Sequence, residues 1–237
     1  MEKKYAILLS FLITVLIASN VFLISSIEDS KQLFTISRVI DGDTLELQDG
    51  TTLRLKNINT PEKNEYGYEQ AKDFLKTFEN KTAIVEKGKL DKYGRTLAKI
   101  YAPEYLNLEI VKQGFAAKFM LDSDANEFIK AEKYAIDNEK GIWKHSEYYN
   151  CFELKIKEKI ISIKNNCQSL NLNNWTLREE GRKKYSFPEV SSEQIKLHLS
   201  NGTSNQTDLF WQSSPSAENT FYLLDSQQRI VNYEINY

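Results

Sequence analysis

Apolar and polar side chains alternate along residues 34–58, which is the spacing of half-buried β-strands. Asp49-Gly50 stands between two of these runs and favours the tight turn of a β-hairpin. Residues 82–86 and 96–101 form a further pair of strand-like runs around a bend at residues 91–94. Together these patterns predict about five strands, and the apolar positions of the first stretch are Phe34, Ile36, Leu45, Leu47, Leu53 and Leu55.

Three other stretches follow the helical period, in which apolar residues recur every three or four positions. Residues 65–80 form the first, and a short helix is expected from its cap at Asn107 to a stop at Gly114. A longer helix is expected over residues 124–140, with Gly141 as its stop. This block therefore has about five strands and three helices and ends near Trp143; the helical stripes are Ala71, Phe74, Leu75 and Phe78, then Phe128, Ala131 and Ala135.

The pattern changes after residue 150. Residues 153–164 alternate Lys, Glu and Ile, and turns rich in Asn, Ser and Gly separate further short strand-like runs. Closely spaced short strands with polar turns are typical of a β-sandwich. We therefore expect a mainly β protein with some helix, in which residues 33–145 form one domain and residues 153–237 form an all-β second domain.

The most apolar stretch of the chain is residues 5–27, which carry no charged side chain. A run of this length can cross the roughly 30 Å hydrocarbon core of a bilayer as a helix. We favour an uncleaved single-pass anchor at residues 1–27 over a cleaved signal peptide, whose apolar centre is usually shorter. Lys3 and Lys4 precede the run and predict a cytoplasmic N-terminus, so that the rest of the chain lies outside the cytoplasm, secreted if the segment is cleaved.

Charge and cysteine content add limited information. The formal net charge is −2, so any binding of nucleic acid must depend on a local group of Lys and Arg. Cys151 and Cys167 fit either one disulfide or two free thiols. A zinc site is not indicated, because their spacing, with only His145 and His198 to add, matches no usual zinc motif.

Candidate chemistry begins at the end of the first strand-like run, where Val39-Ile-Asp-Gly-Asp-Thr44 brings two carboxylates close together. Asp-Gly is common in turns, but two neighbouring carboxylates also repel each other unless a cation lies between them. An EF-hand loop is excluded, because its fifth and sixth positions hold Leu45 and Glu46. Asp41 and Asp43 therefore indicate either a turn or a metal site.

Three more polar groups follow in the same block. Arg54 lies on a strand-like run, and Asn59-Thr60-Pro61-Glu62 follows it, a segment that also suits the start of a helix. Asp91-Lys92-Tyr93-Gly94-Arg95 is compatible with an ordinary bend. Each group has a structural explanation when taken alone.

In this order, however, the groups resemble the staphylococcal nuclease (thermonuclease) family over residues 34–144. The shared motifs are the I-D-G-D-T turn, the L-R-L strand, T-P-E and D-K-Y-G-R, followed by V-K-Q-G and the closing G-I-W. The resemblance implies an OB-type five-stranded barrel with three helices, a fold that commonly binds nucleic acid.

The resemblance also implies residue roles. Asp43 would be the main Ca²⁺ ligand, with Asn59 and the Thr60 carbonyl nearby and Asp41 supporting the turn or the outer coordination shell. Glu62 would act as the general base on water. Catalytic roles at the phosphate would fall to Arg54 and Arg95, and the substrate's terminal phosphate would contact Lys92 and Tyr93.

The residue types in these roles suit the hydrolysis of a phosphodiester. A cation and two guanidinium groups offset the negative charge of a phosphodiester, and Ca²⁺ prefers oxygen ligands. With no histidine inside the block, a carboxylate is the available base. The best-known family members carry Asp where this chain has Asn59, so we expect weaker Ca²⁺ binding here.

Residues 153–237 resemble a lamin-tail domain, an immunoglobulin-like β-sandwich, mainly through Trp175, Leu177 and Phe187-Pro188. Arg182-Lys183-Lys184 is a local basic run that fits either a solvated turn or a contact with a nucleic-acid backbone. We hypothesise that this module holds the enzyme or its substrate at the cell surface.

The leading hypothesis is a membrane-anchored, Ca²⁺-dependent nuclease that hydrolyses DNA or RNA outside the cytoplasm, with no obligate protein partner expected. One alternative keeps the OB fold but has little or no catalysis and binds nucleic acid. A second is an adhesive surface protein, which would not require Asp43, Arg54, Glu62 and Arg95 together. Calcium-dependent release of nucleotides distinguishes the first two.

Overall fold

The computed structural model describes residues 5, 9–20, 31–120, 125–167, 171–212, 215 and 219–236. Residues 9–20 are helical, whereas residues 1–4, 6–8 and 21–27 of the expected membrane anchor lie outside the described part. Within the described part, no helix has both the length and the apolar character needed to span a bilayer. The anchor stays a prediction.

The chain folds as two compact units. The barrel unit comprises Met1–Ile40, Thr44–Lys56 and Lys76–Leu106, and the sandwich unit comprises Asp41–Asp43, Asn57–Leu75 and Asn107–Tyr237. The sandwich unit thus contains parts of the expected nuclease block together with the C-terminal strands.

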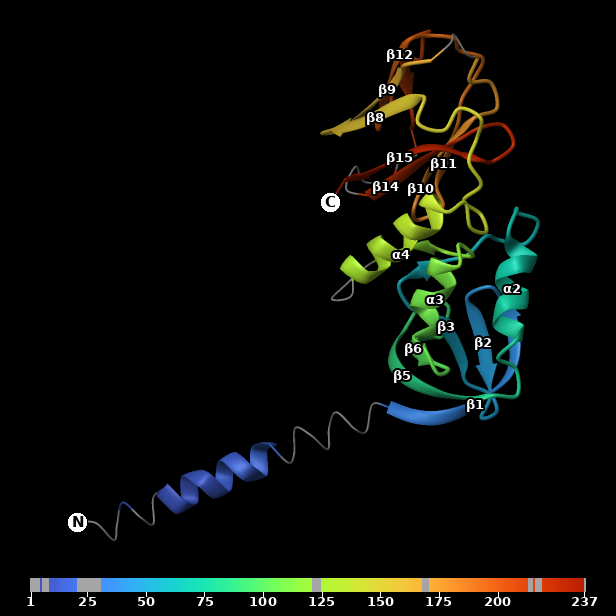
Figure 1. Ribbon diagram of the computed structural model, residues 1–237. Helices are drawn as coiled ribbons and strands as arrows, with labels where there is room; N and C mark the ends of the chain where they lie inside the picture. The colour runs from blue at the N-terminus through green and yellow to red at the C-terminus, as the bar shows by residue number, and fades with distance from the viewer. Residues whose placement is uncertain are drawn as a thin grey trace. The chain divides into compact units, whose positions relative to one another are not determined.

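The barrel unit is built on a closed barrel with the strand order β1-β2-β3-β6-β5 (Figure 1). Neighbouring strands β2 and β3 are antiparallel and β3 and β6 are parallel. Alternate side chains of these strands point inward, and Leu45, Leu53 and Leu55 are fully buried. The five predicted strands and the hairpin at Asp49-Gly50 are confirmed, in agreement with an OB-type fold; the bounds are β1 Lys31–Asp41, β2 Thr44–Leu47, β3 Thr52–Leu55, β5 Thr82–Leu90 and β6 Thr96–Tyr101.

The three predicted helices are present as α2 (Tyr68–Lys76), α3 (Leu106–Lys112) and α4 (Ala125–Asp137). The first begins three residues later than its pattern predicts, because turns occupy residues 63–67. In these turns the Glu65 N–H donates to the Glu62 carbonyl, and Asn64 has a positive φ of 73°. A helix start at Thr60-Pro61-Glu62 is therefore wrong.

A two-stranded sheet that the sequence pattern did not indicate joins β4 (Ile58–Asn59) to β7 (Ala117–Lys118). The pairing is antiparallel, with Asn59 opposite Ala117. Both strands are too short to show a period of two. This small sheet fixes the backbone on which Asn59 stands.

The C-terminal strands form two four-stranded sheets in the orders β11-β10-β14-β15 and β13-β12-β9-β8 (Figure 1). Apolar side chains of both sheets, such as Leu177 and Leu197, meet in one core around Trp175. The predicted two-sheet arrangement is present, while the lamin-tail resemblance stays a prediction. The strand bounds are β8 Phe152–Lys157, β9 Ile160–Asn165, β10 Thr176–Glu179, β11 Lys184–Ser186, β12 Gln194–His198, β13 Asp208–Phe210, β14 Asn219–Leu224 and β15 Ile230–Asn236.

Two further features consolidate the sandwich unit. Cys151 and Cys167 form a disulfide, with their Cα atoms 5.4 Å apart, which decides between the two open alternatives. A second core joins α4 to β14 and β15 through Ile136, Tyr222 and Ile230, and Trp143 belongs to the same core. Helix α4 therefore packs on the sandwich rather than forming a separate layer.

Candidate active site

The turn between β1 and β2 places Asp43 in a buried position, 3% exposed. The Asp43 N–H donates to the Asp41 carboxylate at 3.1 Å, so Asp41 stabilises the turn. A Cβ atom on Gly42 would lie 2.7 Å from the Ala71 Cβ and 2.8 Å from the Thr60 hydroxyl oxygen. The turn thus requires glycine at its centre because Thr60 approaches so closely.

Arg182, in the connection between β10 and β11, extends its guanidinium among three oxygen atoms that sequence reasoning assigned to metal binding and catalysis. Its Nη2 lies 3.4 Å from Asp43 Oδ2 and 3.2 Å from the Thr60 carbonyl oxygen. Its Nη1 forms an ion pair with Glu62 Oε1. The structure therefore brings Asp43, Thr60 and Glu62 around one cationic group.

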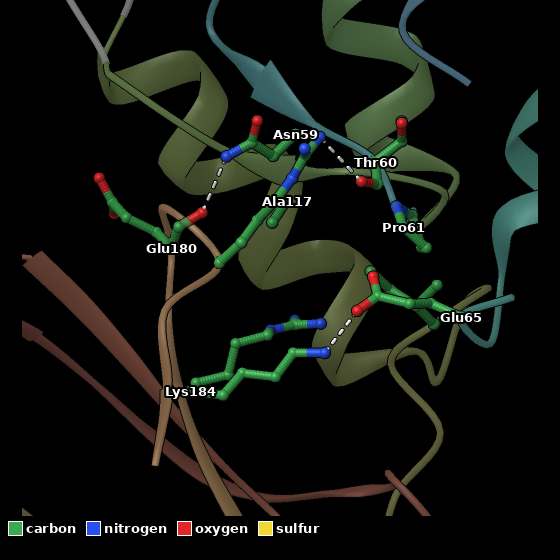
Figure 2. Close-up of a pocket in the computed structure, with 10 residues that line it drawn as sticks. Asn59, Thr60, Pro61, Glu65, Ala117, Glu180 and Lys184 are labelled. Carbon is green, nitrogen blue, oxygen red and sulfur yellow. Dashed lines mark hydrogen bonds and ion pairs between the residues drawn. The ribbon is translucent and has the colours of Figure 1, made fainter. Parts of the chain in front are cut away.

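Two more contacts link the β10–β11 connection and the start of β11 to residues 59–65. Asn59 Nδ2 donates to the Glu180 carbonyl at 3.0 Å, and Lys184 forms an ion pair with Glu65. Figure 2 shows Asn59 facing Glu180 and Lys184 facing Glu65 along the wall of a small pocket. The basic run at residues 182–184 is thus more than a solvated turn.

The two arginines expected at the phosphate, Arg54 and Arg95, both belong to the barrel unit. Arg54 is 9% exposed, stands opposite Thr44 in the β2–β3 register and donates to the Leu55 carbonyl at 2.6 Å. Arg95 Nη1 donates to the Thr44 hydroxyl at 3.0 Å. Thr44 follows Asp43 directly in the chain.

Asp91 organises the bend that carries Arg95. Its carboxylate accepts hydrogen bonds from the N–H groups of Tyr93 and Arg95, at 2.9 and 3.0 Å, and from Arg95 Nε at 2.8 Å. Burial raises the pKa of Asp91, but these hydrogen bonds outweigh it and leave the pKa below its usual value. Lys92 lies 4.9 Å from the ring centre of Tyr93, which is 71% exposed and open to a ligand.

A buried charged cluster, which sequence reasoning missed, supports residue Glu180. Lys118 Nζ lies 2.9 Å from Glu180 Oε2 and 3.7 Å from Glu132 Oε2, and the Tyr222 hydroxyl donates to Glu132. Burial raises the pKa of Glu132 and also raises that of Tyr222 well above its usual value. One signal was available: Glu132 falls four residues after Phe128, on the apolar stripe of α4.

The oxygen atoms around Arg182 are of the chemical types that bind a hard divalent cation. Carboxylate and carbonyl oxygens are the ligands that Ca²⁺ takes, and here three such oxygens already surround one positive charge. Over the part of the chain that the structure covers, no three His, Cys, Asp or Glu side chains gather as a metal-binding group. A site at this position would therefore depend on the Thr60 carbonyl and the Asn59 side chain as well as on Asp43.

Comparison with known proteins gives consistent matches. A family model described as "Staphylococcal nuclease homologue" matches residues 52–145. An "Uncharacterized endonuclease" of Escherichia coli O157:H7 is 30% identical over 118 residues, which cover 47% of this chain and 77% of that protein. An "Uncharacterized endonuclease" of Haemophilus influenzae is 30% identical over 144 residues, which cover 58% of this chain and 80% of that protein.

Proposed function

This chain belongs to the staphylococcal nuclease homologue family and is a phosphodiester hydrolase, and from that premise we propose that it cleaves DNA or RNA with Ca²⁺ bound at Asp43. The observation that carries the proposal is the convergence of Asp43 Oδ2, the Thr60 carbonyl oxygen and Glu62 Oε1 on one cationic group. Acceptor oxygens gathered in this way repel one another unless a cation lies among them. The same three residues are those that the family resemblance implies for the ion and the base.

Ca²⁺ would be held by Asp43, Asn59 and the Thr60 carbonyl, with Asp41 fixing the turn through the Asp43 N–H. When bound, this ion supplies positive charge that offsets the charge of the scissile phosphate. Asn59 contributes an oxygen but no charge, so the affinity of the site for Ca²⁺ is expected to be modest. Millimolar Ca²⁺, as found outside cells, suits such a site.

Glu62 is the proposed general base. Its side chain is 60% exposed, so a water molecule can approach the carboxylate and transfer a proton to it. Arg54 and Arg95 are proposed to bind the phosphate oxygens and to stabilise the charge that develops as water attacks. Both arginines fall within residues 52–145, which match the family model, and this supports the assignment.

Lys92 and Tyr93 are proposed to contact a terminal phosphate of the substrate. Both stand on the bend that Asp91 holds, two or three residues before Arg95. Their position therefore depends on the same carboxylate that orients Arg95. A lysine is a suitable point charge for a phosphate that can bind in more than one orientation.

We further propose that the enzyme acts outside the cytoplasm, held by residues 5–27. Two features support this. The segment lacks charged side chains, and the Cys151–Cys167 disulfide is of a type that persists in oxidising compartments.

The proposal is tested by measuring the release of acid-soluble nucleotides from single-stranded DNA and from RNA, with Ca²⁺ and then with a chelator. Substitution Glu62→Gln removes the base while keeping the size of the side chain, and should lower the rate by about 10²–10⁴-fold. Arg54→Ala should lower it by about 10²–10³-fold. A matched control is Glu69→Gln, which removes an exposed carboxylate from α2 and should leave the rate unchanged.

Near-normal cleavage by Glu62→Gln, or cleavage that persists in the chelator, would exclude this mechanism. Binding of nucleic acid without cleavage by the unmodified chain would favour the alternative of a non-catalytic OB-fold protein.

A further inference from the structure

Arg182 holds the position that a divalent ion would need. We propose that its guanidinium and Ca²⁺ compete for Asp43 and the Thr60 carbonyl, so that Arg182, which also pairs with Glu62, controls how readily the ion binds. This inference rests on the proposed function, because it assumes that the ion uses these oxygens. It adds a residue from the C-terminal β-sandwich to a site expected only within residues 33–145.

The geometry leaves no room for both cations at once. Arg182 Nη2 lies within 3.4 Å of Asp43 Oδ2 and 3.2 Å of the Thr60 carbonyl oxygen, and Nη1 contacts Glu62 Oε1. Ca²⁺ binds oxygens at about 2.3–2.6 Å, so an ion on these oxygens would lie against the guanidinium and repel it. One cation must therefore leave before the other binds.

The backbone that carries Arg182 is firmly held. Glu180 Oε2 accepts hydrogen bonds from Lys118 Nζ at 2.9 Å and from the Thr220 N–H at 3.3 Å, and both partners are buried. The Arg182 N–H donates to the Glu179 carbonyl at 2.9 Å in a turn where Arg182 has a φ of 81°. The turn thus aims Arg182 at the site, and exchange of the two cations would require its side chain to move.

The side chain itself is well placed to leave. It is 36% exposed, so the guanidinium can rotate into solvent and keep its charge hydrated. Its departure would also release Glu62 from the ion pair, which makes that carboxylate available to water. Binding of the divalent ion and preparation of the base are therefore coupled through one arginine.

The charges around the site agree with this competition. Residues 182 and 184 supply two positive charges to three carboxylates, those of Asp43, Glu62 and Glu65. Lys184 pairs with Glu65, so it does not take part in the exchange. Replacement of Arg182 by Ca²⁺ would raise the positive charge at Asp43 and Glu62 by one unit.

The test is a calorimetric titration of the full chain, solubilised in detergent, with Ca²⁺ in the absence of nucleic acid. Arg182→Gln removes the competing charge and should bind Ca²⁺ about tenfold more tightly or better, the equivalent of one charge-assisted hydrogen bond. Arg182→Met keeps the aliphatic stem and should give the same gain. The matched control Lys183→Gln removes one positive charge at the next residue and should bind Ca²⁺ as the unmodified chain does.

Asp43→Asn separates the two proposals, because it removes a ligand that both require. If Asp43→Asn loses Ca²⁺ binding while both Arg182 variants bind no tighter than the unmodified chain, competition by Arg182 is refuted and the proposed ion site stands. If Asp43→Asn binds Ca²⁺ normally, the ion site itself is wrong and this inference fails with it. Circular dichroism of each variant confirms that the fold is retained.

Discussion

Single residues around the candidate site are arranged so that carboxylates face cations. Arg182 contacts both Asp43 and Glu62, Lys184 contacts Glu65, and Arg95 contacts Asp91. The Arg182–Glu62 pair is largely solvent-exposed, at 36% and 60%, and such pairs contribute about 0–1 kcal/mol to folding stability. We therefore assign this arginine a role in the site rather than in stability, and Arg182 variants should fold normally.

A substitution at Asp91 tests whether this residue orients the Arg95 guanidinium. Asp91→Asn weakens the acceptor for Arg95 Nε and for two backbone N–H groups, so the guanidinium loses its fixed direction. A shift of about 1 Å in such a group costs on the order of 10²-fold in rate, which steady-state cleavage assays would detect. The control is Asp49→Asn, because Asp49 accepts the Thr51 N–H at 2.9 Å in a similar bend without an arginine. Equal losses in both variants would contradict the special role of Asp91.

The same carboxylate predicts a pH dependence. Since the pKa of Asp91 is lowered on folding from the ordinary 3.8, its ionised form stabilises the folded bend at every pH above 3.8. That stabilisation is lost as the pH falls below 3.8 and through the lowered value. The unmodified chain and Asp91→Asn should therefore differ in stability at neutral pH and converge in strong acid, as followed by urea unfolding at each pH.

At the scale of elements, most residues of the site stand on connections between strands, whereas Asn59 and Arg54 stand on strands. Asp43 stands on the β1–β2 turn, and Asn59 belongs to the β4–β7 pair. Thr60 and Glu62 precede the late start of α2, and Arg182 lies between β10 and β11. Loops carried on a rigid framework commonly hold binding residues, because their backbones need not follow one repeating geometry.

A substitution at Gly42 tests the role of the β1–β2 turn. Gly42→Ala places a methyl group 2.7 Å from the Ala71 Cβ and 2.8 Å from the Thr60 hydroxyl oxygen, so the turn must move and carry Asp43 with it. We expect Ca²⁺ affinity, measured by calorimetry, to fall by about tenfold or more, together with a loss of stability of about 1–3 kcal/mol.

The control for this prediction is Gly50→Ala in the β2–β3 hairpin. A Cβ there meets no atom within 4 Å, although its φ of 82° makes alanine strained by about 1 kcal/mol. It should lower stability but leave Ca²⁺ affinity unchanged. If Gly42→Ala binds Ca²⁺ as tightly as Gly50→Ala does, the close approach of Thr60 does not matter for the site.

At the scale of the whole molecule, the sandwich unit is consolidated by one apolar core between its sheets, a second core against α4 and one disulfide. The Cys151–Cys167 bond joins residues 16 apart, and closing a loop of about that length restricts the unfolded chain by about 3 kcal/mol. The double substitution Cys151→Ser with Cys167→Ser should therefore lower the free energy of unfolding by about 2–4 kcal/mol.

Urea unfolding followed by tryptophan fluorescence measures this change, because all three tryptophans, Trp143, Trp175 and Trp211, lie in the sandwich unit. Reductant should destabilise the unmodified chain by the same amount and leave the double variant unaffected. A midpoint for the unmodified chain that does not respond to reductant would show that the bond contributes nothing to stability.

Much of the fold was predictable from local pattern. The alternation at residues 34–58 and the stripes at Phe74 and Phe128 depend only on which side of a strand or helix each side chain faces, and the barrel and three helices follow them. The ends of helices and strands were harder to predict from the sequence. Thr60-Pro61-Glu62 suits a helix start, but turns occupy residues 63–67 and helix α2 begins at Tyr68. The β4–β7 pair escaped prediction because two residues per strand cannot show a period.

By itself, the sequence determined the barrel strands, the helices, the family motifs and the chemical types of residue at the candidate site, because each is encoded within a short span of neighbours. Only the tertiary structure decided that Cys151 and Cys167 pair, that Lys118 and Glu132 are buried together, and that Arg182 reaches Glu62 across 120 residues of chain. Such contacts depend on how distant segments pack, and no local spacing records which cation will meet which carboxylate.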